Sequence, residues 1–355
     1  MRIGLLGAGR IGAFHAATLA AHREVGELLV ADVDPLRARQ VAAEHGGAAC
    51  SVDELFHRRP DAVVIATATA AHAGQIAAAA LAGLPAFCEK PVAVDLPGTI
   101  AALHAVETAG TVLQIGFQRR FDPGYRAARE ALRTGRVGRL HTVRTVSSDG
   151  SPPPAAYVPL SGGLYRDCLI HDFDIVRWVT GREVTEVYAT GTNVGADHFR
   201  AAGDVDTASV LLTLEGGVLA TATAARYHAA GYDVRMELAG TEDQLTVGGG
   251  PRAPMTSVEP LVAGPAVLPG GRVDKWPGFL ERFASAYRAE IAAFLRVARG
   301  EAPNPCEGRD ALRALLVAEA CEVSRRERRP VALAEVEPAG PAGPARPSER
   351  IGVVT

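Results

Sequence analysis

The amino-acid sequence predicts an α/β protein with an N-terminal doubly wound parallel sheet and a C-terminal α+β domain built on a large, mostly antiparallel open sheet. Short apolar runs alternate with helical patterns from Arg2 to Ile115, whereas strands with more Thr/Val alternation and tighter turns follow Gly116. A length of 355 residues suits two hydrophobic cores. We therefore expect domains at 1–121 and 122–334, and a disordered tail at 335–355, which is rich in Pro, Gly and Ala.

The composition is that of an ordinary globular protein, with 48% hydrophobic and 22% charged residues. A net charge of −3 gives no reason to expect nucleic acid or an anionic membrane as a partner. The five cysteines are far apart and include no C-x-x-C pair, which favours reduced thiols in the cytoplasm over disulfides or a zinc site. The ten histidines show no metal-ligand spacing, and no apolar run is long enough to span a bilayer. We expect a cytoplasmic protein that uses no metal.

A glycine-rich motif follows the first predicted strand, Arg2–Leu6, and opens a predicted helix from Ile11 to about His22. This G-x-G-x-x-G in a strand–turn–helix context is the dinucleotide-binding fingerprint of a Rossmann domain. The first glycine makes the tight turn, the second admits the pyrophosphate and the third allows close packing of helix and strand. The helix N-terminus would then bind the pyrophosphate. The residues of this motif are Gly7, Ala8, Gly9, Arg10, Ile11 and Gly12.

The second predicted strand, Leu28–Ala31, ends at Asp32, twenty positions after Gly12. This is the spacing of the acid that binds the adenosine ribose hydroxyls, and it favours NAD because a carboxylate repels a 2′-phosphate. Asp34 is a rival for the role, although it precedes Pro35 and is well placed to cap a helix over 35–44. Two arginines on that helix, Arg37 and Arg39, are positioned to meet a 2′-phosphate, so NADP stays open.

Further candidates follow the third and fourth expected strands, Ala62–Ala66 and Ala86–Cys88, at the edge where open α/β sheets bind ligands. His72 either contacts the cofactor or caps a helix over 74–82. Lys90, fixed by Pro91, can hydrogen-bond both the nicotinamide ribose and a substrate hydroxyl. We count Thr67, His72, Glu89 and Lys90 among the cofactor-binding residues. A capping box at 51–54, a helix at 96–109 and a strand at 111–115 complete this domain.

The second domain is expected to contain helices at 123–132, 279–299 and 309–325 and strands at 140–147, 208–214, 218–223, 233–238 and 244–247. The strands at 208–214 and 218–223 flank a Glu-Gly-Gly turn and form a hairpin. The stretch 248–274 is expected to be a loop. An antiparallel sheet of this kind commonly has one face free for a partner.

The stretch SGGLYRDCLIHDFDIVRW, 161–178, carries the candidate chemistry. As an α-helix it places Asp167, His171 and Asp174 on one face, at i, i+4 and i+7, and Leu169, Phe173 and Val176 on an opposite, apolar face. A neutral imidazole can accept a proton near neutral pH, and a nearby carboxylate can orient it. A metal site is not expected here, because adjacent His171 and Asp172 cannot face the same point on a helix.

From the start to about Leu333 the chain resembles the Gfo/Idh/MocA family of nicotinamide-dependent sugar and polyol oxidoreductases, in particular its inositol-oxidising members. The resemblance rests on GLLGAGRIGAFHA, VADVDP, FCEKP, QIGFQRRFDPGY, the PPPAAYVPL segment with the 161–178 stretch, and YHAAGYDVRMELAGTED. It implies a catalytic set of Lys90, Asp167 and His171, in which His171 takes the hydroxyl proton as hydride passes to NAD. It also implies that Arg119 lies near the nicotinamide, that Tyr232 faces the substrate and that the protein is a homo-tetramer formed through the C-terminal sheets.

Three departures from the family pattern leave the polyol open: Cys168 in place of methionine, Gln118 in place of asparagine or methionine, and SSDGS at 147–151. The leading interpretation is an NAD-dependent dehydrogenase acting on a CH–OH group of inositol or a related cyclic polyol or sugar. The alternatives are a dehydrogenase of glucose, an aminosugar or another inositol isomer, which in one version retains and recycles NAD, and a non-catalytic NAD-binding regulatory protein, since fold does not fix function.

Overall fold

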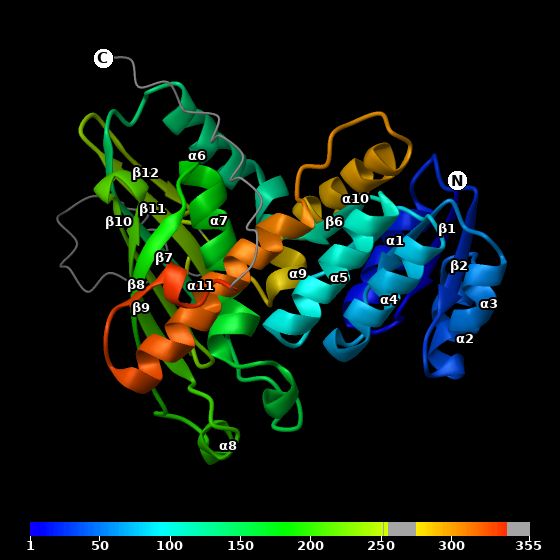
Figure 1. Ribbon diagram of the computed structural model, residues 1–355, viewed down its shortest axis with the longest axis horizontal. Coiled ribbons are helices and arrows are strands. Elements are labelled where there is room, and N and C mark those ends of the chain that lie inside the picture. The colour runs from blue at the N-terminus through cyan, green and yellow to red at the C-terminus, as the bar shows by residue number, and fades with distance from the viewer. Residues whose placement is uncertain (251, 255–274, 339–355) are drawn as a thin grey trace, which may run out of the picture. The chain divides into compact units, whose positions relative to one another are not determined.

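A computed structural model describes residues 1–250, 252–254 and 275–338 (Figure 1). The chain forms two compact units. The first comprises Met1–Phe121 together with Ala284–Arg313, and the second comprises Asp122–Phe283 together with the chain from Ala314 onward. The predicted loop lies outside the described residues at 251 and 255–274, and the predicted tail lies outside them from 339.

The first unit contains a six-stranded sheet in the order β3-β2-β1-β4-β5-β6, in which every pairing is parallel. Its strands are β1 Arg2–Leu6, β2 Glu27–Ala31, β3 Ala48–Cys50, β4 Ala62–Ile65, β5 Ala86–Glu89 and β6 Leu113–Gly116. The predicted doubly wound sheet is confirmed. Strand β3 was not predicted, because its three half-buried residues form neither an alternating pattern nor an apolar run.

Helices cover both faces of this sheet: α1 Arg10–Ala20, α2 Pro35–Glu44, α3 Val52–His57, α4 Thr69–Leu81, α5 Leu96–Ala109 and α10 Ala284–Ala298. Asp34 caps α2 by accepting from the N–H groups of Leu36 and Arg37. Only half of the predicted capping box forms at α3: Ser51 accepts from the Glu54 N–H, but the Glu54 carboxylate pairs with Arg58 instead. The predicted start of α4 at Gly74 is wrong, because the alanine-rich segment before it is already helical.

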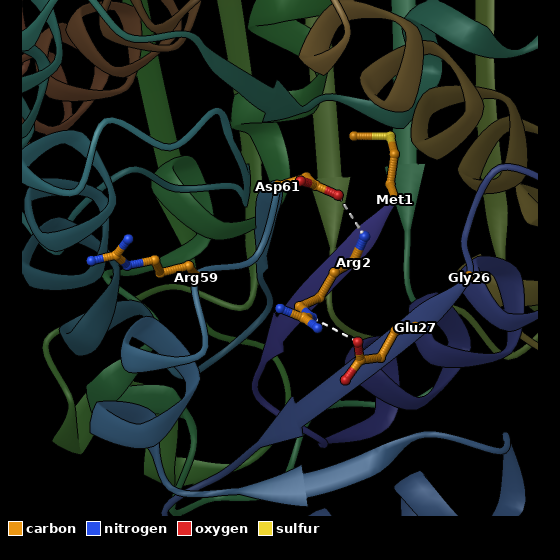
Figure 2. A pocket seen from close by; sticks show the side chains of 6 residues that line it. All are labelled: Met1, Arg2, Gly26, Glu27, Arg59 and Asp61. Atoms are coloured by element: carbon orange, nitrogen blue, oxygen red, sulfur yellow. Dashed lines mark hydrogen bonds and ion pairs between the residues drawn. The ribbon is translucent and has the colours of Figure 1, made fainter.

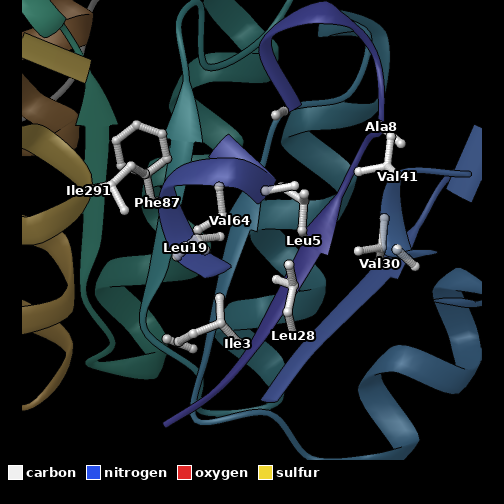
Figure 3. Packing of buried hydrophobic residues seen from close by; sticks show 14 of the residues in the cluster. Ile3, Leu5, Ala8, Leu19, Leu28, Val30, Val41, Val64, Phe87 and Ile291 are labelled. Carbon is white, nitrogen blue, oxygen red and sulfur yellow. The ribbon is translucent and has the colours of Figure 1, made fainter. Parts of the chain in front are cut away.

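Neighbouring residues of β1 face opposite layers. Ile3 and Leu5 belong to a buried cluster with residues of α1, α2 and α10 (Figure 3), whereas Gly4 faces Leu55 of α3. A Cβ on Gly4 would lie 2.6 Å from Leu55 Cδ2, so the sheet and α3 pack closely there. Because alternate residues of a strand point to opposite faces, this strand packs against helices on both sides of the sheet.

The expected second domain at 122–334 needs correction, because 284–313 belongs to the first unit. Ile291 of α10 is fully buried in the same cluster as Phe87 of β5 (Figure 3). Phe294 of α10 is fully buried in this cluster as well. The Gln114 side chain of β6 also donates to the Glu290 carbonyl oxygen at 3.1 Å. The sequence shows that α10 has an apolar face, but the face alone does not say which sheet it covers.

The second unit contains a seven-stranded sheet in the order β12-β11-β7-β10-β9-β8-β13. Its strands are β7 Leu140–Ser148, β8 Val184–Thr192, β9 Thr207–Leu214, β10 Leu219–Ala225, β11 Asp233–Gly240, β12 Gln244–Val247 and β13 Val331–Ala332. The predicted hairpin is confirmed as β9 and β10. The sheet is mostly antiparallel as predicted, but β7 and β10 pair in parallel, and β8 and β13 were not predicted.

The helices of this unit include α6 Pro123–Arg133, α7 Ile170–Thr180, α8 Asp197–Ala201, α9 Phe279–Arg282 and the Ala314 onward part of α11 Gly308–Glu327. Helix α6 packs against α7, and the Arg129 guanidinium lies 4.4 Å from the Trp178 ring centre. The predicted helix at 279–299 is interrupted at Phe283, which separates α9 from α10.

One face of the seven-stranded sheet is apolar and buried, and the alternate residues are exposed. Val210, Leu212 and Ala222 belong to the buried set, whereas Tyr188, Leu211 and Leu219 are exposed. This agrees with a sheet that has one free face. Within the described residues, no helix is long and apolar enough to cross a membrane.

Candidate active site

The glycine-rich loop between β1 and α1 has the backbone geometry that its sequence predicts. Gly7 has φ of +97°, and a Cβ there would lie 2.5 Å from the Ala66 carbonyl oxygen. A Cβ on Gly12 would overlap the Gly7 carbonyl oxygen, whereas one on Gly9 would meet nothing within 4 Å. The turn and the helix–strand packing therefore require Gly7 and Gly12, while open space at Gly9 leaves room for a ligand to approach the backbone.

The N-terminus of α1 completes this site. The helix begins at Arg10 after Gly9, no side chain caps it, and its first turn contains no acidic residue. Its first N–H groups and the positive end of the helix dipole therefore lack a protein anion. That environment fits the pyrophosphate of a dinucleotide.

Asp32 lies at the carboxyl end of β2 and contacts the glycine-rich loop directly. Its Oδ2 accepts from the Ala8 N–H at 2.7 Å, and its Oδ1 accepts from the Asp34 N–H at 2.8 Å. Arg37 lies 3.6 Å from both Asp32 and Asp34, and Arg39 is exposed. Asp34 serves as the α2 cap, which leaves Asp32 as the candidate for a ribose contact beside the loop.

His72 lies inside α4 and links two chain segments. Its Nδ1 is 2.7 Å from the Pro91 carbonyl oxygen and its Nε2 is 3.0 Å from the Thr67 carbonyl oxygen. Burial lowers the pKa of His72 although both carbonyl contacts favour protonation. Neither expected role, cofactor contact or helix cap, matches these contacts, because both ring nitrogens contact the protein's own backbone. The Thr67 hydroxyl donates a hydrogen bond to Oε1 of Gln75 at 2.7 Å.

Glu89 and Lys90 are consecutive but have different surroundings. The Glu89 carboxylate points into the first unit, where its Oε1 is 2.7 Å from Nε2 of His15. The Glu89 side chain therefore does not support the expected contact with the cofactor. Lys90 is half-buried and directly follows β5, at the carboxyl edge of the parallel sheet. Arg119 is almost fully buried in the 3₁₀ segment η1, Gln118–Phe121.

In the second unit, the start of the predicted α-helix over 161–178 is wrong, because residues 161–163 are not helical. The helical part opens with a π-helical turn, η3 Tyr165–Leu169, and continues as α7. Asp167 lies in the π turn and His171 in the first turn of α7. The predicted i, i+4 phase between them is therefore altered, because a π turn contains an additional residue. The opposite face is as predicted, with Leu169, Phe173 and Val176 buried. Turns of this type occur frequently at functional sites.

Asp167 is held by two residues that sequence reasoning missed. Its Oδ1 accepts from the Tyr157 hydroxyl at 3.1 Å, and its Oδ2 accepts from the Arg226 guanidinium at 2.6 Å. The side chain of Arg226 is only 4% exposed, and it also donates to Asp149 at 3.1 Å. The only sequence signal for Arg226 is a cation directly after the apolar alternation of β10.

The pKa shifts around Arg226 follow from burial and charge. Burial lowers the pKa of Arg226, but its neighbours Cys168, Asp167 and Asp149 raise it overall. Burial raises the pKa of Asp149, and Arg226 opposes that shift. Burial and the Asp167 charge raise the pKa of Tyr157, so this phenol remains a donor. The network favours an ionised Asp167 with fixed orientation.

The SSDGS segment at 147–151, which differs from the family pattern, contributes both to the packing of α7 and to the Arg226 network. Ser147 donates to Asp172 at 2.6 Å, which ties α7 to β7. Asp149 joins Arg226 instead. A Cβ on Gly150 would lie 3.5 Å from the Tyr232 backbone nitrogen, so this segment runs beside Tyr232. Asp174 is fully buried in α7.

A shallow surface pocket in the first unit lies away from the predicted site residues. Figure 2 shows its lining residues: Met1, Arg2, Gly26, Glu27, Arg59 and Asp61. Arg2 pairs with Glu27 at 2.6 Å, and its backbone N–H donates to Asp61 at 2.7 Å (Figure 2). These residues flank the amino ends of the strands, opposite the edge where α/β sheets bind ligands.

Comparisons with known proteins cover both units. The oxidoreductase family with an NAD-binding Rossmann fold matches residues 1–117, and the GFO/IDH/MocA C-terminal domain matches 125–246. The myo-inositol dehydrogenase Hyg17 of Streptomyces leeuwenhoekii is 39% identical over 329 residues, which cover 90% of this chain and 96% of that protein.

Solved structures give the same result. A myo-inositol dehydrogenase from Corynebacterium glutamicum is similar with a TM-score of 0.84 and 33% identity, covering 96% of this chain and 99% of that one. The scyllo-inositol dehydrogenase of Lactobacillus casei, solved with bound NAD(H) and scyllo-inositol, has a TM-score of 0.83 and 28% identity, covering 94% of this chain and 99% of that one.

Proposed function

The chain belongs to the GFO/IDH/MocA family of oxidoreductases, and from this premise we propose that it is an NAD-dependent dehydrogenase that oxidises a secondary hydroxyl of an inositol. The observation that supports this best is the Arg226–Asp167 pair one turn before His171. It fixes the carboxylate of Asp167 four residues before His171, and we propose that this carboxylate and the imidazole act together in proton abstraction from a hydroxyl.

The residues present fit NAD as the cofactor. Gly9 leaves open space, the α1 N-terminus has no side-chain cap, and Asp32 offers a carboxylate beside the loop. We propose Gly7, Gly9, Arg10, Ile11, Gly12 and Asp32 as its principal binding residues, with Thr67, Lys90 and Arg119 as further contacts. When bound, NAD supplies a hydride acceptor. Because the Glu89 carboxylate points into the protein and the His72 ring contacts backbone, we leave both out of this set.

We propose Lys90, Asp167 and His171 as the catalytic residues. His171 accepts the proton of the reacting hydroxyl, and Asp167 accepts a hydrogen bond from a neighbouring hydroxyl of the polyol and stabilises the imidazolium as it forms. Arg226 and Tyr157 hold Asp167 in one orientation, so little reorganisation is needed during the reaction. Lys90 contributes a positive charge that polarises the same oxygen, and Tyr232 contacts the substrate.

The test is NADH formation by purified protein at mildly alkaline pH. Myo-inositol, scyllo-inositol, chiro-inositol and glucose are compared, and the His171→Ala variant serves as the negative control. We expect turnover of at least one inositol, and no loss of turnover after chelation, because no step uses a metal. The absence of turnover with every inositol, despite measurable NAD binding, would contradict the proposed substrate class.

A second candidate within the same class is a dehydrogenase of a different cyclic polyol or sugar. The SSDGS segment favours it, because Asp149 of this segment pairs with the arginine that holds Asp167. Turnover of glucose or an aminosugar alone supports this candidate. NAD that remains bound through gel filtration supports the version in which the cofactor is recycled.

We also propose that the protein is a cytoplasmic homo-tetramer. Exposed Tyr188, Leu211 and Leu219 give the open sheet face the apolar character of an interface. All five cysteines are free thiols, which suits a reducing compartment. Light scattering should give four times the chain mass for the unaltered protein and a smaller assembly for Leu211→Asp. A monomeric unaltered protein contradicts the proposed assembly.

A further inference from the structure

Three ionisable side chains meet in the apolar interior of the first unit, and the reaction described above uses none of them. They are His15 of α1, Glu89 of β5 and Glu290 of α10, and their ligand atoms lie within 4.8 Å of one another. His15 and Glu290 are fully buried, and Glu89 is nearly so. The rings of Phe14, Phe87 and Tyr287 surround His15. Placing three such groups in an aromatic pocket is costly, so a role for them is expected.

Their contacts indicate where the protons are. Nε2 of His15 lies 2.7 Å from Oε1 of Glu89, and a carboxylate can only accept, so the imidazole donates from Nε2. Among the described residues, no hydrogen-bond donor reaches either carboxyl oxygen of Glu290, and the group beside it is the carboxylate of Glu89, which can only accept. Burial, reinforced by the charge of Glu89, raises the pKa of Glu290 well above its usual range. The protonated form of Glu290 is therefore favoured, and that form has an O–H to offer to Glu89.

The other charged groups near Glu290 do not change this assignment. The segment η1, which packs against α10, contains Arg119 and Arg120. Arg120 donates to Asp310 at 3.0 Å and to the Pro305 carbonyl oxygen. Tyr287 of α10 packs edge-on against the His15 ring. The negative charge that acts on Glu290 is that of Glu89.

The cluster is connected to Lys90 through the backbone. Glu89 immediately precedes Lys90, and Pro91, which follows it, has its carbonyl oxygen 2.7 Å from Nδ1 of His72. Both neighbours of Lys90 are thus attached to a buried histidine. The strand beside β5 is also shaped around the cluster, because a Cβ on Gly116 would lie 3.0 Å from Oε2 of Glu89.

We propose that His15, Glu89 and Glu290 form a buried proton-sharing cluster that positions Lys90 for the reaction. Glu89 accepts from His15 on one side and from the protonated Glu290 on the other, which fixes its side chain and therefore the backbone from which Lys90 projects. The inference relies on the proposed function only for the role of Lys90. The residues are positioning residues, because none of them is argued to touch substrate.

The first experiment tests the proton on Glu290. The unaltered protein should show the infrared C=O stretch of a protonated carboxylic acid at neutral pH, and Glu290→Gln should lose this band. Glu301→Gln is the matched control, because Glu301 is an exposed partner of Arg299 in the same unit. No protonated-acid band in the unaltered protein, or a stoichiometric divalent metal by elemental analysis, would falsify the cluster.

The proton also predicts how stability depends on pH. An unfolded glutamate titrates near 4.5, whereas folded Glu290 holds its proton to a higher pH. The folded state then binds more protons than the unfolded state, so this contribution to stability is present below pH 4.5 and is lost as pH rises toward the folded pKa. Glu290→Gln should flatten this fall in the melting temperature, and Glu301→Gln should not. Identical pH profiles for unaltered protein and Glu290→Gln contradict the assignment.

The second experiment measures the environment of the Lys90 side chain by NMR. Lys90 and Lys275 are the only lysines in the chain, so isotope-labelled lysine gives two side-chain NMR signals, one of them an internal control. Glu290→Leu keeps a buried side chain but removes the donor, and it should shift the Lys90 signal and lower kcat by about 10²-fold. Glu290→Gln retains a donor and should restore both.

These outcomes separate the two proposals. If the unaltered protein turns over no polyol, the proposed function fails, whereas the infrared band and the Lys90 signal still decide the cluster. If Glu290→Leu folds and leaves both the Lys90 signal and kcat unchanged, the cluster has only a packing role and the inference is wrong.

Discussion

The two units place their functional groups by different means. In the first unit the cofactor-binding candidates come from one short loop, Gly7–Gly12, and the end of the next strand. In the second unit Asp167 is held by Tyr157, ten residues before it, and by Arg226, fifty-nine residues after it. A local motif defines the first arrangement. In the second, the parallel pairing of β7 with β10 brings Arg226 beside Asp149, and the same arginine holds Asp167. Backbone geometry therefore dominates in one unit and side-chain electrostatics in the other.

The difference shows how each unit should respond to mutation. At Gly12 and Gly7, any larger residue would overlap backbone atoms, and no rearrangement of side chains relieves that overlap. At Arg226 the requirement is a positive charge, because one buried guanidinium pairs with two carboxylates. The changes below test this contrast.

Replacement of His171 by alanine should have the largest effect, because it removes the proposed proton acceptor. We expect turnover to fall by about 10²–10⁴-fold with NAD affinity unchanged. Steady-state rates and quenching of protein fluorescence by NADH measure the two quantities. Near-normal turnover in a variant that still binds NAD contradicts the role of His171.

Replacement of Arg226 by methionine tests the electrostatic side of the comparison. It leaves Asp149 and Asp167 without their shared cation, and we expect a loss of about 3–5 kcal/mol in the free energy of unfolding. Urea denaturation measures it. A second Asp149→Asn change in the same variant should recover part of the loss, because one buried charge is removed. Full stability of Arg226→Met argues against a buried ion network.

Two glycine substitutions test the steric side. Gly12→Ala should destabilise the first unit by about 1–3 kcal/mol through overlap with the Gly7 carbonyl oxygen. Gly9→Ala should unfold like the unaltered protein and yet bind NAD more weakly, because its Cβ enters open space kept for the ligand. Denaturation and NAD titration on both variants distinguish the effects. Equal NAD affinity for Gly9→Ala and the unaltered protein places the cofactor elsewhere.

Replacement of Asp32 by serine should have the smallest effect. It removes a carboxylate that repels a 2′-phosphate and leaves Arg37, which lies 3.6 Å from Asp32, able to attract one. We expect the ratio of kcat/KM for NADP over NAD to rise by roughly tenfold or more. The substitution introduces no Lys or Arg, so any gain in the use of NADP comes from the loss of the Asp32 carboxylate alone. An unchanged ratio means that Asp32 is not the ribose acid.

Much of the fold could be predicted from the sequence, because the bounds of many helices and strands depend on residues that are close together in the chain. The bounds of β1 and α5 and the Asp34 cap of α2 follow from apolar runs, Pro and capping residues a few positions apart. The fingerprint glycines are equally local. The apolar face of α7 was also predicted correctly, although its first turn is π-helical.

The tertiary structure decided which distant residues meet. It assigned α10 to the first unit, paired β7 with β10 in parallel, and turned Glu89 inward toward His15. No pattern within a few residues encodes these contacts, because they depend on which apolar faces pack together and on how buried charges find partners across long stretches of chain. By itself the sequence determined a nucleotide-binding sheet and predicted Asp167 and His171 as candidate catalytic residues, and the packing determined which side chains hold Asp167 in place.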